Sequence, residues 1–170
     1  MENTHCGPVY NAVLNAPVFS AEDTTEPVTL QEAKDWCRID VTDDDSLITS
    51  LITAARIMCE HYANLSFINR TVTAKIKNGL GCFNPPYGPL KEITSAKDSD
   101  GVDIADFDFD CAYSGKITVV YTAGYEALPL NLKTAILNQI SFLYENRGDV
   151  RLQNGMSEEA KLVLNQVRIV

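Results

Sequence analysis

Residues 28–64, VTLQEAKDWCRIDVTDDDSLITSLITAARIMCEHYAN, contain two helical patterns on either side of an acidic link. In the first pattern, Thr29 and Glu32 have the spacing of a capping box, in which each side chain satisfies a backbone donor of the other residue. In the second, apolar residues recur every three or four positions, and further apolar residues widen the stripe beyond one face. We therefore expect helices at about 29–39 and 43–63. The second is expected to be buried on two sides, within the fold or against another subunit.

The period of the apolar residues changes after the second helix. Residues 71–77 and 116–122 alternate as strands do, and glycines and prolines interrupt the chain between them. A third helical pattern begins at Pro129, where the fixed φ and the missing N–H of proline cost little. The sequence thus predicts a mainly helical α+β fold. A small helical bundle carries a β-rich insertion, at about 70–123, between the second helix and a third helix at about 129–147.

The chain divides into three parts. Residues 1–27 contain several prolines and are acidic toward their end, which predicts an extended or flexible arm; the alternative is an arm that orders on a neighbouring subunit. Residues 28–150 form the main domain, and residues 151–170 contain a short helix that Ser157 can cap. The side chains expected to form the bundle core are Leu51, Ile52, Ala55, Leu132, Ile136 and Ile140.

Composition excludes several classes of protein. There are 23 acidic and 14 basic residues, for a net charge of -9. Because a nucleic-acid binder needs Lys and Arg to displace counterions, this balance argues against DNA or RNA as a tightly bound partner, although DNA sliding past an acidic surface is compatible with it. The 5 cysteines are widely spaced without a CxxC pair, which favours free thiols in a reducing compartment. No run reaches the ~18 apolar residues of a membrane span, and the first residues do not resemble a secretory signal.

No motif indicates catalysis or metal binding. The chain has 2 histidines and lacks the GxSxG, HExxH and GxxxxGK[ST] patterns. Asp98, Asp100, Gly101 and Asp103 fail the calcium-loop spacing because the glycine comes too early, so they predict a turn. We expect no enzyme activity, no catalytic residues, no cofactor and no metal.

An acidic stripe precedes the last strand pattern. Asp106, Asp108 and Asp110 alternate with Phe107 and Phe109, which is most simply the solvent-facing side of a strand. The functional alternative is an acidic inter-subunit or channel face that meets a basic neighbour.

The C-terminal segment is unusually apolar. The residues concerned are Leu162, Val163, Val167, Ile169 and Val170. Because exposed apolar clusters promote association, they are candidates for docking on a neighbouring subunit or on a partner. The alternative is that the short helix folds back onto its own bundle.

Three blocks, in this order, resemble the gp6-like head–tail connector proteins of tailed bacteriophages and prophages, a group also described as phage proteins of possible DNA packaging function. The first is residues 28–64, quoted above. The second is KITVVYTAGY at 116–125, and the third is LPLNLKTAILNQISFLYENRGDV at 128–150. Each block alone is a short amphipathic pattern, so the resemblance depends on their order. It covers about residues 28–150, and the arm of residues 1–27 precedes it.

The resemblance implies a structural adaptor of the virion. Such proteins form a ring with copies of themselves, typically dodecameric, beneath the portal protein. The ring offers an attachment site to the tail, through a stopper or tail-completion protein, and lets DNA through in passage. Assembly would take place in the host cytoplasm, with no membrane involved.

Other functions stay open at this point. A stopper or tail-completion protein fits the sequence nearly as well as an adaptor. A small DNA-packaging regulator would need a basic helix, and a tail-associated hydrolase would need a convergent polar constellation; the sequence shows neither.

Overall fold

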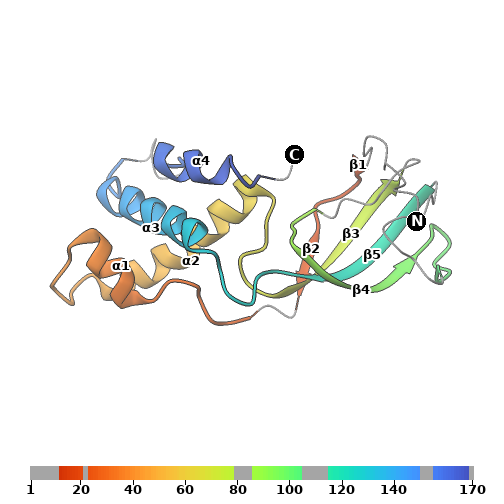
Figure 1. Cartoon of the computed structure of the whole chain (residues 1–170), viewed down its shortest axis with the longest axis horizontal. Helices are drawn as coiled ribbons and strands as arrows, with labels where there is room; N and C mark the ends of the chain where they lie inside the picture. Colours follow the sequence, from red (N-terminus) through yellow and green to blue (C-terminus); the bar gives the residue numbers. More distant parts are fainter. Residues whose placement is uncertain (1–11, 21–22, 79–85, 105–114, 150–154, 169–170) are drawn as a thin grey trace, which may run out of the picture. The chain divides into compact units, whose positions relative to one another are not determined.

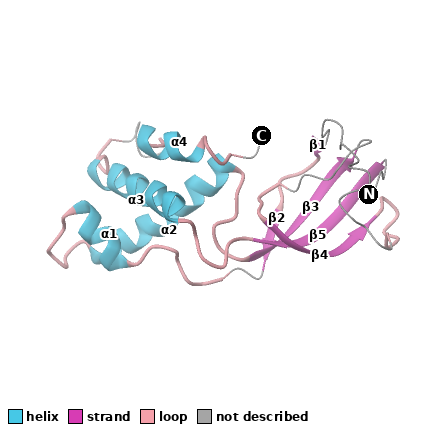
Figure 2. Cartoon of the chain, in the orientation of Figure 1, coloured by secondary structure: helices cyan, strands magenta, loops and turns pink. Residues whose placement is uncertain are grey.

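The computed structural model describes residues 12–20, 23–78, 86–104, 115–149 and 155–168. These residues form two compact units, one of strands and one of helices (Figure 1, Figure 2). The strands fall within Met1–Glu22 and Asn69–Gly124, and the helices within Asp23–Ile68 and Tyr125–Val170. Each unit is therefore assembled from two separate stretches of the sequence.

Within the described residues, four helices make up the helical unit. They are α1 (Leu30–Cys37), α2 (Asp45–Ala63), α3 (Leu130–Glu145) and α4 (Glu158–Leu164). Helix α3 packs against each of the other three, and α2 also contacts α1 and α4. The first three lie close to the helices expected at about 29–39, 43–63 and 129–147.

The ends of α1 and α2 follow from local chemistry. Thr29 Oγ1 accepts a hydrogen bond from the Glu32 N–H (3.2 Å), and the Glu32 carboxylate accepts one from the Thr29 N–H (2.9 Å). This capping box, expected from the sequence, is confirmed; it pairs donors that the first turn of a helix leaves unsatisfied. At their C-terminal ends, Arg38 (φ 56°) and Asn64 (φ 55°) adopt the left-handed conformation that ends each helix.

The helical unit has its own apolar core. Five of the six expected core residues have exposed fractions between 0% and 3%, and Leu51 packs against them partly buried. The five are Ile52, Ala55, Leu132, Ile136 and Ile140. Because each buried large aliphatic side chain contributes ~1.5–3 kcal/mol, this cluster accounts for much of the stability of the unit. Among the described residues, no helix combines the length and the apolar character needed to cross a bilayer.

The strand unit is a five-stranded antiparallel sheet. Its strands are β1 (Ala12–Val13), β2 (Val18–Ser20), β3 (Arg70–Asn78), β4 (Leu90–Lys97) and β5 (Gly115–Ala123). The order is β1-β3-β5-β4, and β2 also pairs with β3. Alternate residues of β3 and β5 are buried on one face, with Val72 opposite Tyr121 and Ile76 opposite Ile117. These residues form a second core, separate from the helical one.

The predicted fold class is wrong in one respect. The fold is α+β, but it is not a mainly helical bundle with an inserted β region, because the sheet has a core of its own and draws two strands from the chain before α1. The physical reason lies in β1 and β2. Strands of two and three residues are too short to show an alternating pattern, and their pairing with β3 determines their conformation. Residues 12–20 thus contribute strands from within the segment expected to be an arm.

Candidate interaction surfaces

The acidic turn after β4 uses its carboxylates locally. Asp98 Oδ1 accepts hydrogen bonds from the N–H groups of Asp100 and Val102, both at 2.9 Å, and Asp103 pairs with Lys97 at 3.5 Å. The turn predicted here is confirmed. Across the described ranges, no group of three or more His, Cys, Asp or Glu residues is placed to hold a metal ion.

Two cysteines lie in the described residues, and both are free thiols there. They are Cys37, which is partly buried, and Cys59, which is buried. Burial, with a smaller effect from the nearby Glu60 charge, raises the pKa of Cys59 to about 12. Because the thiolate is the reactive form, this thiol is a packing residue and not a nucleophile. Cys6, Cys82 and Cys111 lie outside the described residues.

Helix α4, within the C-terminal segment that was a docking candidate, packs onto its own bundle. Ala160 and Leu164 are fully buried in the helical core, and Val163 and Val167 pack against that core partly buried. Leu162 points away from it, with an exposed fraction of 69%. The inner face of α4 therefore folds back onto its own bundle, which was the alternative to docking. The side chain of Leu162 is exposed to solvent on the outer face.

Polar contacts also hold this segment in place. The side-chain amide of Gln139, which is fully buried, accepts a hydrogen bond from the Ser157 N–H (2.8 Å) and donates one to the Gly155 carbonyl (3.0 Å). The Tyr62 hydroxyl donates to the Asn165 side chain at 2.9 Å. Residues 155–168 are thus an integral part of the helical unit.

Five of the candidate residues fall outside the described part of the chain. They are Ile169 and Val170 at the C-terminus and Asp106, Asp108 and Asp110 in the acidic stripe.

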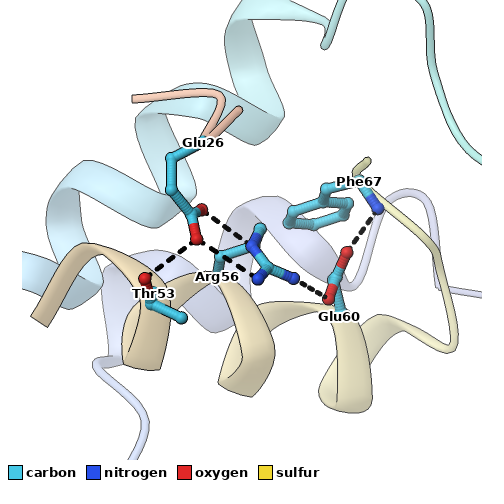
Figure 3. Close-up of polar contacts among 5 residues, drawn as sticks. All are labelled: Glu26, Thr53, Arg56, Glu60 and Phe67. Carbon is cyan, nitrogen blue, oxygen red and sulfur yellow. Dashed lines mark hydrogen bonds and ion pairs between the residues drawn. The ribbon is translucent and has the colours of Figure 1, made fainter. Parts of the chain in front are cut away.

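An ion network that sequence reasoning missed lies along α2 (Figure 3). Arg56 Nε donates to Glu26 at 2.7 Å, and Arg56 Nη1 donates to Glu60 at 2.9 Å. Glu60 also accepts from the Phe67 N–H at 2.6 Å, and Thr53 donates to Glu26 at 2.9 Å. The side chains of Arg56 and Glu60 are only 7% and 2% exposed. The one signal in the sequence was an Arg and a Glu four residues apart within an apolar helix.

The network fixes two segments of chain at the border of the helical unit. Burial opposes the charge of Arg56, but its hydrogen bond to Glu26 and the charge of Glu60 outweigh burial, so its pKa is raised. Glu26 lies in the segment that enters α1, and Phe67 lies in the segment that leaves α2 for β3. The guanidinium therefore joins the incoming and outgoing chain through two carboxylates.

The link between α1 and α2 exposes both acidic and apolar side chains. Asp44 accepts from the Tyr144 hydroxyl at 2.6 Å, and Asp45 pairs with Lys34 at 2.6 Å, so these two carboxylates serve the fold. The neighbouring residues Trp36, Asp40, Val41 and Asp43 are exposed. We call these four residues the loop surface.

The side of the sheet opposite its core carries lysines. Alternation along β3 and β5 places Lys75, Lys77 and Lys116 on that side. Lys97 of β4 lies on the same side, because it is the cross-strand partner of Thr118 in β5. All four lysines are exposed. We call them the lysine face.

A family model described as phage gp6-like head-tail connector protein matches residues 27–168 of this chain. The chain belongs to this family. The match confirms the resemblance seen in the sequence and makes the chain a structural connector protein. It also extends beyond residue 150, so the family's domain includes α4 of this connector.

Solved structures share the connector's fold. A chain in the neck of an empty GTA particle, computed with C6 symmetry, is 17% identical, with a TM-score of 0.64 over 90% of this chain and 96% of that one. A chain in the virion of a native gene transfer agent (GTA) particle is 18% identical, with a TM-score of 0.66 over 94% and 95%. A chain in the neck of a native GTA particle, computed with C12 symmetry, is 19% identical, with a TM-score of 0.61 over 90% and 96%. No curated protein matches the sequence.

Proposed function

We propose that this connector is an adaptor that assembles with copies of itself into a dodecameric ring beneath the portal, in the virion. The observation that carries the proposal is the family match over residues 27–168. Two structures with the same fold come from particle necks computed with C6 and C12 symmetry. A subunit repeated around such an axis forms a closed ring through head-to-tail contacts, which supports the ring.

The chemistry of the chain supports a passive role toward DNA. With a net charge of -9, the ring would repel the phosphate backbone instead of binding it, so DNA would pass without being retained. We propose no catalytic activity and no cofactor. The partners are the portal protein on one side and a stopper or tail-completion protein on the other, joined in the host cytoplasm during assembly.

A gene deletion tests the proposal directly. Without this chain, the expected products are DNA-filled heads and free tails that do not join, and the purified chain should restore joining when added to the mixed extract. Joined particles in the deletion strain would contradict a connector role. Binding order separates the two virion roles: an adaptor binds purified portal directly, whereas a chain that binds only a portal already carrying another ring protein would be a stopper.

Leu162 is the described residue that keeps the C-terminal docking proposal open. Its side chain is 69% exposed on α4, next to the partly buried Val163 and Val167. We propose that Leu162, Val163, Val167, Ile169 and Val170 form an apolar docking patch, in which Leu162 is the exposed contact residue. Leu162→Asp should leave the melting temperature unchanged and weaken binding to portal or neighbour. Unchanged binding would remove α4 from the interface.

We also propose that the acidic stripe Asp106, Asp108 and Asp110 faces either solvent or a basic neighbour in the ring. Changing all three to Asn separates the two. Assembly unaffected by the change indicates a solvent face, whereas assembly weakened by both the change and added salt indicates a charged contact. Assembly that is insensitive to salt and yet abolished by the change would contradict both.

A further inference from the structure

The lysine face is a concentrated positive surface on an acidic chain. Lys77 and Lys116 are direct cross-strand partners in the register of β3 and β5. Like charges placed directly opposite each other destabilise a sheet. Within the described residues, no acidic side chain pairs with Lys75, Lys77 or Lys116, while Lys97 has its contact with Asp103. The fold therefore carries a local electrostatic cost that no described ion pair offsets.

Protection of a sheet edge does not explain Lys75, Lys77 and Lys116, although Lys97 lies in the edge strand β4. Edge strands often carry lysine to block pairing with other chains, but β3 and β5 both lie inside the strand order β1-β3-β5-β4. The face also has apolar character. A depression of about 190 Å³ brings Leu14, which is 42% exposed, together with Lys75, Lys116 and the carboxylate of Asp98. An apolar contact area bordered by polar side chains matches the layout of a protein interface, which has an apolar core and a polar rim.

The loop surface has the complementary chemistry, with the exposed Arg38 as a single cation between Trp36 and Asp40. Trp36 and Val41 are 46% and 57% exposed, and Asp40 and Asp43 lie beside them in sequence. Neither aspartate has a basic partner within the described residues. Residues 23–68 as a whole contain nine acidic and three basic residues. An exposed tryptophan is also a frequent centre of binding energy at interfaces.

We propose that the lysine face of one copy of this chain docks on the loop surface of the next copy. This inference rests on the ring proposed above and names the contact that repeats around it. Two different surfaces of one chain make a head-to-tail contact, which is the type that generates rings. DNA is a poorer occupant, because Asp98, Asp100 and Asp103 border the lysine face and reduce the positive charge that phosphate binding requires.

Charge reversal on each surface provides the test. The first variant, Lys75→Glu with Lys116→Glu, and the second, Asp40→Lys with Asp43→Lys, each place like charges across the contact. Each should raise the apparent dissociation constant of self-assembly by at least about tenfold, measured by mass photometry over a concentration series. Wild-type assembly should also weaken as salt is added.

Two rescues make the test specific. A chain that carries all four reversals restores opposite charges at every contact and should assemble as the wild type does. An equimolar mixture of the two variants should also assemble, because alternating copies again pair opposite charges. Matched controls are Lys91→Glu, at the other end of β4, and Glu159→Lys, in the first turn of α4. Both controls should assemble normally, and melting curves should show that every variant is folded.

The outcomes separate this contact from the ring itself. Rings that form unchanged from both reversal variants, or loss of assembly that neither rescue repairs, would overturn the contact and leave the ring in place. A wild-type chain that stays monomeric in solution and in isolated particle necks would overturn both proposals. Retardation of duplex DNA by the wild type, lost on reversing the lysines and unaffected by the loop variant, would assign the lysine face to DNA.

Discussion

Arg56 shows how a single side chain organises the helical unit. Its guanidinium contacts two carboxylates that lie 30 and 4 residues away in the sequence. The nearer contact follows from helix geometry, since residues four apart share a face. The contact with Glu26 depends on how the chain approaches α1, which no local pattern encodes. Sequence reasoning therefore missed the network, although it found the capping box of Thr29 and Glu32, which is entirely local.

Removing Arg56 should be costly. Arg56→Ala would remove the ion pair between Arg56 and the Glu60 carboxylate, which is 2% exposed. Breaking a buried pair from one side costs about 3–5 kcal/mol, so the urea midpoint should fall markedly. Lys161→Ala is the control, because its pair with Glu158 lies on the surface, and it should leave the midpoint nearly unchanged. Equal effects of the two changes would show that the network is not structural.

Glu32 should contribute a pH dependence. The hydrogen bond from Lys133, followed by that from the Thr29 N–H, lowers its pKa from 4.5 to about 2. Since the folded-state pKa is the lower one, the stabilisation is present above pH 4.5 and is lost as the pH falls toward 2. Its side chain is 42% exposed, so the effect is limited to about 1 kcal/mol or less.

The measurement compares the wild type with Glu32→Gln in urea at several pH values. The difference between their free energies of unfolding should be constant near neutral pH and should narrow between pH 4.5 and 2. A difference that is constant across this window would show that the Lys133 contact is not formed in solution.

The elements differ in how far the sequence determines them. Helices α1, α2 and α3 were predictable because each has a periodic apolar stripe and local stop signals. Strands β3 and β5 were predictable from alternation. Strands β1 and β2 were not, because their conformation comes from pairing with a strand more than fifty residues away in the sequence. For α4 the sequence leaves two outcomes open, since an amphipathic helix fits a bundle and a partner equally well.

Two leucines in α4 provide a matched comparison. Leu164 is fully buried and Leu162 is 69% exposed. Leu164→Ala should lower the free energy of unfolding by about 2–5 kcal/mol, because it leaves a cavity in the helical core. Leu162→Ala should change it by less than about 0.5 kcal/mol. Urea titrations followed by circular dichroism at 222 nm measure both free energies. Similar losses would mean that α4 does not pack as described.

At the scale of the whole molecule, the two separate cores lead us to expect that each unit can be destabilised without the other. Ala135 lies in the helical core and Val119 in the core of the sheet, and both are fully buried. An Asp at either position would place an unpaired charge among apolar side chains. Ala135→Asp should increase amide hydrogen exchange in α2 and α3 more than in β3 and β5, and Val119→Asp should do the reverse. Loss of protection in all four elements with either variant would show that the two units unfold together.

The division of the molecule could be predicted only in part. The sequence indicated a change of period near residue 70 and a return to helix near 129, which are close to the limits of the second stretch of the strand unit. It did not indicate that the chain before α1 completes the sheet. Whether an inserted region shares a core with its host or builds its own depends on contacts between distant residues, and hydrophobic periodicity does not contain that information.

The discontinuous make-up of the two units has a consequence for inheritance. Genetic recombination exchanges continuous stretches of a gene, whereas each unit here combines two stretches. A single crossover between α2 and β5 would give a hybrid in which strands from one parent must pair with strands from the other, and helices likewise. Two crossovers near residues 69 and 124 would exchange the greater part of the sheet while keeping all four helices from one parent. Viable hybrids between diverged relatives should therefore have their junctions at these two positions, or at the ends of the gene.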